Sequence, residues 1–95
     1  MNDAATETYD TVCDALADTP QEAANLKARS ELMGQIAALV GACGWTQAEA
    51  ARRCGVTQPR LNDLLRGRLS RFSLDALVNI AAALGCRVHV GLDAA

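Results

Sequence analysis

Residues 47–66 read QAEAARRCGVTQPRLNDLLR, and the spacing of small, turn-forming and aliphatic residues within this stretch decides the fold. Two helices that cross at a tight turn need a small residue at the crossing and a glycine four residues later. They also need an aliphatic residue directly after the glycine, and two buried positions six and nine residues beyond it. The residues at these five positions are Ala51, Gly55, Val56, Leu61 and Leu64. The spacing therefore predicts a helix-turn-helix over residues 46–66.

Capping residues set the ends of this unit and predict one further helix on each side of it. Thr19 is the predicted cap of the first helix. Pro20 suits the first helical position, and Glu22 lies three residues after Thr19, where it completes a capping box. Each predicted helix is followed by a glycine that can adopt a positive φ. The predicted caps are Thr19, Thr46, Thr57 and Ser73, and the predicted stops are Gly44, Gly55, Gly67 and Gly85. The buried sides predicted for the last two helices are Leu61, Leu64 and Leu65, and then Leu74, Leu77, Val78, Ala81 and Leu84.

The first predicted helix is long and contains two glycines. Its apolar residues form two adjacent stripes, one of Leu26, Met33 and Val40 and the other of Leu32, Ile36, Leu39 and Cys43. This spacing predicts a helix over about residues 20–42, although Gly34 and Gly41 each cost it about 1 kcal/mol relative to alanine. The sequence leaves open whether this is one helix or two that meet near Ser30. The glycines are either surface positions or a face for close approach of another backbone.

The two ends of the chain lie outside this bundle. Residues 8–17 predict a short amphipathic helix within an acidic N-terminal segment, residues 1–18. Its apolar residues are Tyr9, Val12, Cys13 and Leu16. At the other end, residues 86–92 alternate apolar with polar or glycine residues, which predicts a β-strand. One strand needs a partner, so this element is expected to pair with a second copy, as a dimerisation element, or with another chain.

Composition excludes several classes of protein. The length of 95 residues suits a single domain. The four cysteines form no CxxC pair and the only histidine, His89, has no neighbour at ligand spacing. Buried free thiols that serve as small apolar residues are therefore expected, with a disulfide or a redox role as the alternative, and no metal. The chain has no nucleophile–base set and no phosphate-binding glycine loop. We therefore expect that the protein is not an enzyme and binds no cofactor. No apolar run reaches the roughly 18 residues of a membrane span, so a soluble, cytoplasmic protein is expected.

The formal net charge of −2 hides two oppositely charged regions. Residues 1–28 contain six acidic residues and one lysine, which gives −5. Residues 46–71 contain six arginines and two acidic residues, which gives +4. This asymmetry indicates two surfaces with different partners. The alternative for the acidic region is that it merely keeps the molecule in solution.

The basic region coincides with the helix-turn-helix, whose second helix enters the major groove of DNA in proteins that use this motif. With its leucines turned inward, this helix offers polar side chains that can read base edges. The predicted base-reading residues are Gln58, Arg60 and Asn62. Residues at helix starts and arginines beyond the helix end suit phosphate. The predicted phosphate-binding residues are Thr46, Gln47, Thr57, Arg66, Arg68 and Arg71.

Each of these side chains also has a purely structural interpretation. Thr46 and Thr57 cap helices whatever else they do. Arg66 at a helix C-terminus interacts favourably with the helix dipole without DNA. Arg52 and Arg53 are expected on a solvated face rather than on DNA. Asp63 would repel phosphate, and is therefore expected at the rim of the interface or beside an arginine that it orients.

The chain resembles the Xre-type, phage-repressor-like helix-turn-helix family over about residues 30–84, and more closely its HigA-like antitoxin branch over about residues 20–90. The resemblance lies in the runs EAANLKARSELM, GWTQAEAARRCGVTQPRLNDLLRGR and FSLDALVNIAAALGCRV. It implies an antitoxin that neutralises a small basic toxin of the RelE/ParE/HigB type and represses its own operon. The chain departs from this resemblance at Gly34 and Gly41, where longer helix-favouring residues are expected.

Together these observations predict an all-α protein: a compact helix bundle with a helix-turn-helix of the phage-repressor type and a short C-terminal β-strand. Residues 19–85 are expected to form the DNA-binding domain, between the acidic segment and the strand at residues 86–92. The predicted function is that of a sequence-specific DNA-binding antitoxin. The alternative is a stand-alone Xre-type repressor without a toxin. The expected partners are double-stranded operator DNA, a basic toxin and a second copy of the chain, with no membrane.

Overall fold

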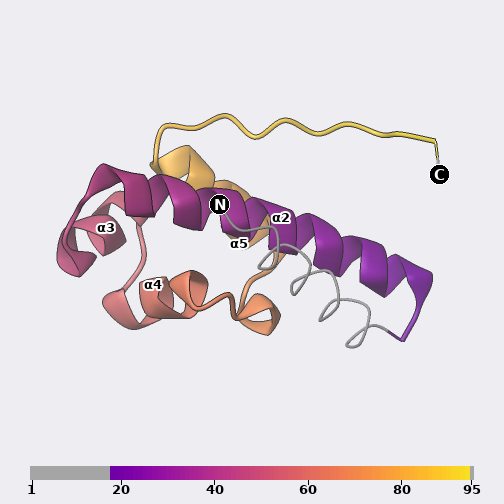
Figure 1. Ribbon diagram of the computed structural model, residues 1–95, viewed down its shortest axis with the longest axis horizontal. Coiled ribbons are helices and arrows are strands. Elements are labelled where there is room, and N and C mark those ends of the chain that lie inside the picture. The colour runs from indigo at the N-terminus through magenta and orange to yellow at the C-terminus, as the bar shows by residue number, and fades with distance from the viewer. Residues whose placement is uncertain (1–17, 95) are drawn as a thin grey trace.

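The computed structural model describes residues 18–94, in which four α-helices and one 3₁₀ turn follow one another along the chain. Their bounds are α2 at Pro20–Cys43, α3 at Gln47–Cys54, α4 at Gln58–Leu65, η1 at Leu69–Arg71 and α5 at Leu74–Ala83. The long α2 runs across the whole molecule, and the shorter helices are arranged along it (Figure 1). Within residues 18–94, no helix combines the length and the apolar character needed to cross a membrane.

All four predicted caps are present at the helix starts. The side-chain oxygen of each capping residue accepts a hydrogen bond from the backbone N–H three residues later, which satisfies a donor that the helix itself leaves unpaired. The caps are Thr19, Thr46, Thr57 and Ser73, with donor–acceptor distances of 3.0, 3.2, 3.3 and 3.1 Å. The four predicted stop glycines all have positive φ. Local sequence therefore fixes where the helices begin and end.

The turn between α3 and α4 forms at the predicted glycine. Gly55 has φ of 71°, and its N–H donates to the carbonyl of Arg52 at 3.2 Å. The N–H of Val56 donates to the carbonyl of Ala51 at 3.0 Å, which closes the helix end in a Schellman motif. The half-buried Val56 packs against the core beside this turn.

The core lies where α2 crosses the other helices, and it includes Ala51, Leu61 and Leu64 as predicted. Its buried apolar residues are Leu26, Met33, Ile36, Val40, Ala50, Ala51, Cys54, Leu61, Leu64, Leu69, Phe72, Leu77, Ile80 and Ala81. The prediction that Leu65 is buried is wrong, because its exposed fraction is 38%. Leu39 on α2 and Leu74 and Val78 on α5 are also more exposed than predicted, at 37%, 36% and 37%. They border a groove that the other helices do not fill.

Arg29 of α2 holds the chain segment around η1, a tether that the sequence did not predict. Its Nη1 donates hydrogen bonds to the carbonyl oxygens of Leu69 and Phe72, both at 3.1 Å. Its Nε donates to Asn25 Oδ1 at 2.7 Å, which fixes the side chain along its own helix. Three acceptors therefore hold one guanidinium, and the loop after α4 is bound to α2.

The predicted strand at residues 86–92 does not form, so the structure is all-helical within residues 18–94. Cys86 donates its N–H to the carbonyl of Ala81, and the chain then runs extended past α2 (Figure 1). A strand is defined by pairing with another strand, and residues 18–94 contain no second extended segment beside this one. The predicted amphipathic helix at residues 8–17 lies outside the described residues.

The long α2 is one continuous helix from Pro20 to Cys43, and Ser30 is a buried position within it. Gly34 and Gly41 do not mark a close approach of another backbone. A Cβ atom placed on either glycine would meet nothing within 4 Å. Both are therefore tolerated positions rather than packing positions.

Gly34→Ala should raise the free energy of unfolding by about 0.5–1 kcal/mol, because alanine in a helix interior loses less backbone entropy than glycine on folding. The space for the new methyl group is already open. Urea unfolding of the two proteins measures the difference. Gly55→Ala is the matched control: its Cβ would also fit, but φ of 71° should make this variant less stable by about 1–2 kcal/mol. Equal effects of the two substitutions would contradict this account.

Candidate nucleic-acid interface

The helix-turn-helix consists of α3 and α4, joined by three residues. The small buried side chains of α3, Ala50, Ala51 and Cys54, allow α4 to pack closely. On α4, Leu61 and Leu64 are each only 1% exposed and turn inward. This packing leaves the other side of α4 to solvent, and it fixes which of its polar side chains point away from the core.

Three side chains spaced four residues apart lie along one face of α4 and its C-terminal end. They are Gln58, Asn62 and Arg66, of which Gln58 and Arg66 are exposed and Asn62 is half-buried. Residues at i, i+4 and i+8 of a helix are offset by about 40° from one to the next, so they form a slanted row along one face. The predicted base-reading residues Gln58 and Asn62 thus share a face with the predicted phosphate-binding residue Arg66.

The third predicted base-reading residue, Arg60, lies away from that face. Its guanidinium carbon stands 4.3 Å from the centre of the buried Phe72 ring, in a cation–π arrangement. Its Nη1 donates to the carbonyl oxygen of Arg71 at 3.2 Å. Arg60 is half-buried and connects the first turn of α4 to the segment after η1. It therefore has a structural role that its position in the sequence does not show.

Asp63 orients two of the predicted phosphate-binding arginines. Its Oδ1 is 2.9 Å from Arg68 Nη1, and its Oδ2 is 3.3 Å from Arg71 Nη1. The exposed fraction of the Asp63 side chain is 15%, against 41% and 57% for the two arginines. The carboxylate is thus covered by the guanidinium groups, whose outer surfaces face solvent. This arrangement matches the prediction that Asp63 lies beside an arginine that it orients.

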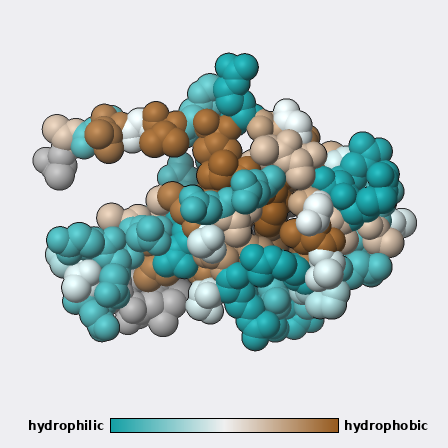
Figure 2. All heavy atoms as spheres, turned by 180° about the vertical axis from the view of Figure 1, so that it is seen from behind, coloured by the Kyte–Doolittle hydropathy of each residue, from teal (hydrophilic) through white to brown (hydrophobic). Residues whose placement is uncertain are grey.

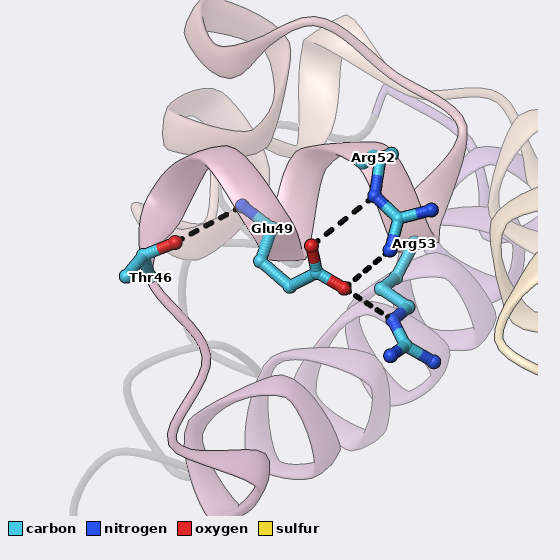
Figure 3. A network of polar contacts seen from close by, with 4 residues as sticks. All are labelled: Thr46, Glu49, Arg52 and Arg53. Atoms are coloured by element: carbon cyan, nitrogen blue, oxygen red, sulfur yellow. Dashed lines mark hydrogen bonds and ion pairs between the residues drawn. The ribbon is translucent and has the colours of Figure 1, made fainter.

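Glu49 binds the two arginines of α3 in the same manner (Figure 3). Arg52 donates from Nη2 to Glu49 Oε2 at 2.5 Å and from Nε to Oε1 at 3.1 Å. Arg53 donates from Nε to Oε2 at 2.6 Å, and its guanidinium lies 5.2 Å from the Trp45 ring centre. The hydrogen bonds from Arg52 and then Arg53 lower the pKa of Glu49 to about 2. Arg52 and Arg53 remain exposed, as predicted.

Three of the predicted phosphate-binding residues lie at helix starts, and two of them also cap their helices. The hydroxyls of Thr46 and Thr57 accept hydrogen bonds from the third residue of their helices. The exposed Gln47 follows the cap of α3. Thr46, Gln47 and Thr57 thus lie at the N-termini of α3 and α4, where backbone N–H groups and the helix dipole favour an anion.

Neither metal nor thiol chemistry is indicated in the part of the chain that the structure describes. Residues 18–94 contain no group of three His, Cys, Asp or Glu side chains that could hold a metal ion. The three cysteines in this range, Cys43, Cys54 and Cys86, are free thiols. The prediction that they are buried is wrong for Cys43 and Cys86, which are exposed, because one lies at the end of α2 and the other follows α5. Cys54 is 2% exposed, and burial raises the pKa of its thiol. It serves as a small apolar residue at the crossing of α3 with its neighbours.

A family model described as a helix-turn-helix domain matches residues 15–92, which is most of the chain. No curated protein matches the chain.

The ion pairs of Glu49 should make part of the stability depend on pH. Because folding lowers the pKa of this carboxyl from 4.5 to about 2, its contribution is present above about pH 4.5 and is lost as the pH falls towards 2. Glu49→Gln should therefore be less stable than the parent at pH 6 and equal to it near pH 2, as measured by urea unfolding. Glu31→Gln is the control, because Glu31 makes no ion pair within residues 18–94. A difference that does not change with pH would contradict the ion pairs.

Proposed function

Since the chain belongs to the helix-turn-helix family, whose members bind DNA in a sequence-specific manner, we propose that α4 enters the major groove of an operator and that the protein is an antitoxin that represses its own operon. The observation that carries the DNA-binding part is the face of Gln58, Asn62 and Arg66. It places two amide side chains and one guanidinium in line on the outer side of the second helix.

The residues proposed to contact DNA fall into two groups. Gln58 and Asn62 read base edges, since an amide side chain can form a pair of hydrogen bonds with adenine. Arg66, Arg68 and Arg71 follow the helix and bind phosphate, together with the helix starts at Thr46, Gln47 and Thr57. The orientation of Arg68 and Arg71 by Asp63 supports this assignment, because fixed guanidinium groups lose less entropy when they bind.

Arg60 is proposed to read a base from the edge of the interface. Only its Nη1 is used in the bond to the Arg71 carbonyl, so further N–H groups of the guanidinium remain to pair with a guanine. Its contacts with Phe72 and Arg71 hold the side chain in one place. Replacement of Arg60 therefore affects stability as well as DNA binding, and the exposed Gln58 gives the cleaner test.

The acidic N-terminal region supports a second partner of basic character. Residues 1–28 carry a net charge of −5, which DNA repels and a small basic toxin attracts. Within this region, Asp18, Glu22 and Lys27 are exposed on and just before the first turns of α2. We assign to this region the neutralisation of a RelE/ParE/HigB-type toxin, the role that the resemblance to HigA-like antitoxins implies. In a stand-alone repressor, the alternative, this charge would merely keep the molecule in solution.

A homodimer is part of the proposal. A helix-turn-helix protein gains specificity when two copies bind half-sites about one turn of DNA apart, roughly 34 Å. One face of three side chains reads too few bases to select an operator by itself.

Gln58→Ala should weaken operator binding by about 1–3 kcal/mol and leave binding to random DNA unchanged, because a base contact carries sequence information. Arg68→Ala should weaken binding to both DNAs and lower the slope of log K against log salt by about one unit, because a phosphate contact carries none. Gel-shift titrations at several salt concentrations measure both effects. Asn79→Ala, at an exposed position of α5 outside the helix-turn-helix, is the control. If Gln58→Ala bound operator as tightly as the parent, α4 would not read bases through this face.

Deletion of residues 1–17 should leave operator binding intact and weaken neutralisation of the toxin. The truncated chain keeps Thr19 as the cap of α2 and the bond from the Asp18 N–H to Glu22 Oε2, so the described fold retains its first helix. The toxin to test is a small basic protein encoded beside this gene. Operator affinity, toxin inhibition and the unfolding midpoint are measured on the same protein. Full neutralisation by the truncated chain would contradict the assignment of toxin binding to residues 1–17, and failure of the full chain to neutralise the toxin would contradict the antitoxin role. A lower midpoint with both activities damaged would show that residues 1–17 support the core instead.

A further inference from the structure

Residues 86–94 form an extended arm that stands away from the helices. Figure 2 shows the arm with apolar side chains along it, projecting from the body of the protein. Val90 and Leu92 are 90% and 99% exposed, the two most exposed large apolar side chains of the described residues. The only backbone hydrogen bond between the arm and the rest of residues 18–94 comes from the N–H of Cys86. Exposed apolar side chains on a backbone with unpaired N–H and C=O groups make a surface that favours pairing with another extended chain.

We propose that two copies of this protein pair through their arms as antiparallel strands, with Val90 of each copy opposite the partner's Val90. The inference rests on the proposed homodimer and goes beyond it by naming the contact surface and its register. The partner is a second copy because the sequence of the arm is complementary to itself when one copy is reversed.

The complementarity is seen in the cross-strand pairs. In this register the residue numbers of each opposed pair add up to 180. Val88 faces the partner's Leu92 on one side of the ribbon, and the two Val90 side chains meet on the same side. On the other side, Arg87 faces the partner's Asp93. The two-fold axis repeats each of these contacts, so the dimer contains two Arg–Asp pairs and a continuous apolar face.

Neighbouring registers lose one or both of these features. A shift of one residue sets apolar side chains opposite polar ones, because successive side chains point to opposite sides. With paired numbers adding up to 178, Arg87 faces Gly91 and Asp93 faces Gly85. With numbers adding up to 182, Arg87 faces Ala95 and Asp93 faces His89. Only the register centred on Val90 pairs the full opposite charges of Arg87 and Asp93 while it matches all three apolar residues.

The groove beside the arm is suited to the apolar face of such a ribbon. It measures about 820 Å³ and lies between the arm, α2 and α5, with Leu32, Leu39, Leu74 and Val78 among its lining residues. Val88 already packs against the core where the arm leaves α5, so the side of the arm that carries Val88, Val90 and Leu92 is turned towards the helices there. Pairing would place the side chains of Val88, Val90 and Leu92 from both copies over the two grooves. It would thereby cover apolar groove surface that a single arm leaves exposed.

Charge reversal tests the register with sedimentation equilibrium of the full chain in the absence of DNA. Arg87→Asp and Asp93→Arg each replace two opposite-charge pairs by two like-charge pairs, and each should raise the dissociation constant of the dimer by at least about tenfold. An equimolar mixture of the two variants should dimerise like the parent. In the mixed dimer, one chain carries carboxylates at both positions and the other carries guanidinium groups.

The controls distinguish a loss of arm pairing from unfolding of the chain and from a failure of the proposed function. Arg87 and Asp93 are exposed, so neither variant should change the unfolding midpoint at a protein concentration low enough for the parent to be monomeric. His89→Ala should dimerise like the parent, because His89 faces Gly91 in this register. Dimers of both charge variants as stable as those of the parent would overturn the arm pairing and leave a homodimer through another surface. A parent chain that stays monomeric would overturn the homodimer itself, whereas gel shifts report on DNA binding separately.

Discussion

The close packing of α3 on α4 is the constraint on which the rest of the structure depends. It requires small side chains at Ala50 and Ala51 and a residue with positive φ at Gly55, because larger side chains or a different turn would separate the two helices. With α4 held at this distance, Leu61 and Leu64 reach the core and Gln58, Asn62 and Arg66 point outward. The orientation of the proposed DNA-reading face is therefore a consequence of core packing.

The charge of the helix-turn-helix is organised by two carboxylates. Glu49 binds Arg52 and Arg53, and Asp63 binds Arg68 and Arg71. In both clusters one carboxylate holds two guanidinium groups, so a net positive charge remains and its position is restricted. Exposed ion pairs of this kind contribute little to the stability of a protein, typically about 0–1 kcal/mol each. The ion pairs of Asp63 also fix the guanidinium groups of Arg68 and Arg71 beside the proposed DNA-reading face.

The proposed DNA surface and the proposed dimer surface do not compete for space. In Figure 1 the arm and α4 lie on opposite sides of α2. Two copies joined through their arms would keep both α4 helices accessible. Arg29 binds the loop after α4 to α2. The proposed phosphate-binding segment and the long helix that borders the groove therefore belong to one packed unit.

The sequence by itself determined the elements and their ends. The caps at Thr19, Thr46, Thr57 and Ser73 and the turn at Gly55 depend on hydrogen bonds between residues three to five apart, and such contacts can be read from spacing. Only the tertiary structure decided the contacts between distant residues. Arg29 binds carbonyl oxygens 40 and 43 residues away, and Arg60 packs on Phe72, although backbone acceptors and ring faces leave no signature in a sequence. The same limit explains the exposed Leu65 and the absent strand, because burial and strand pairing depend on what lies opposite a residue in space.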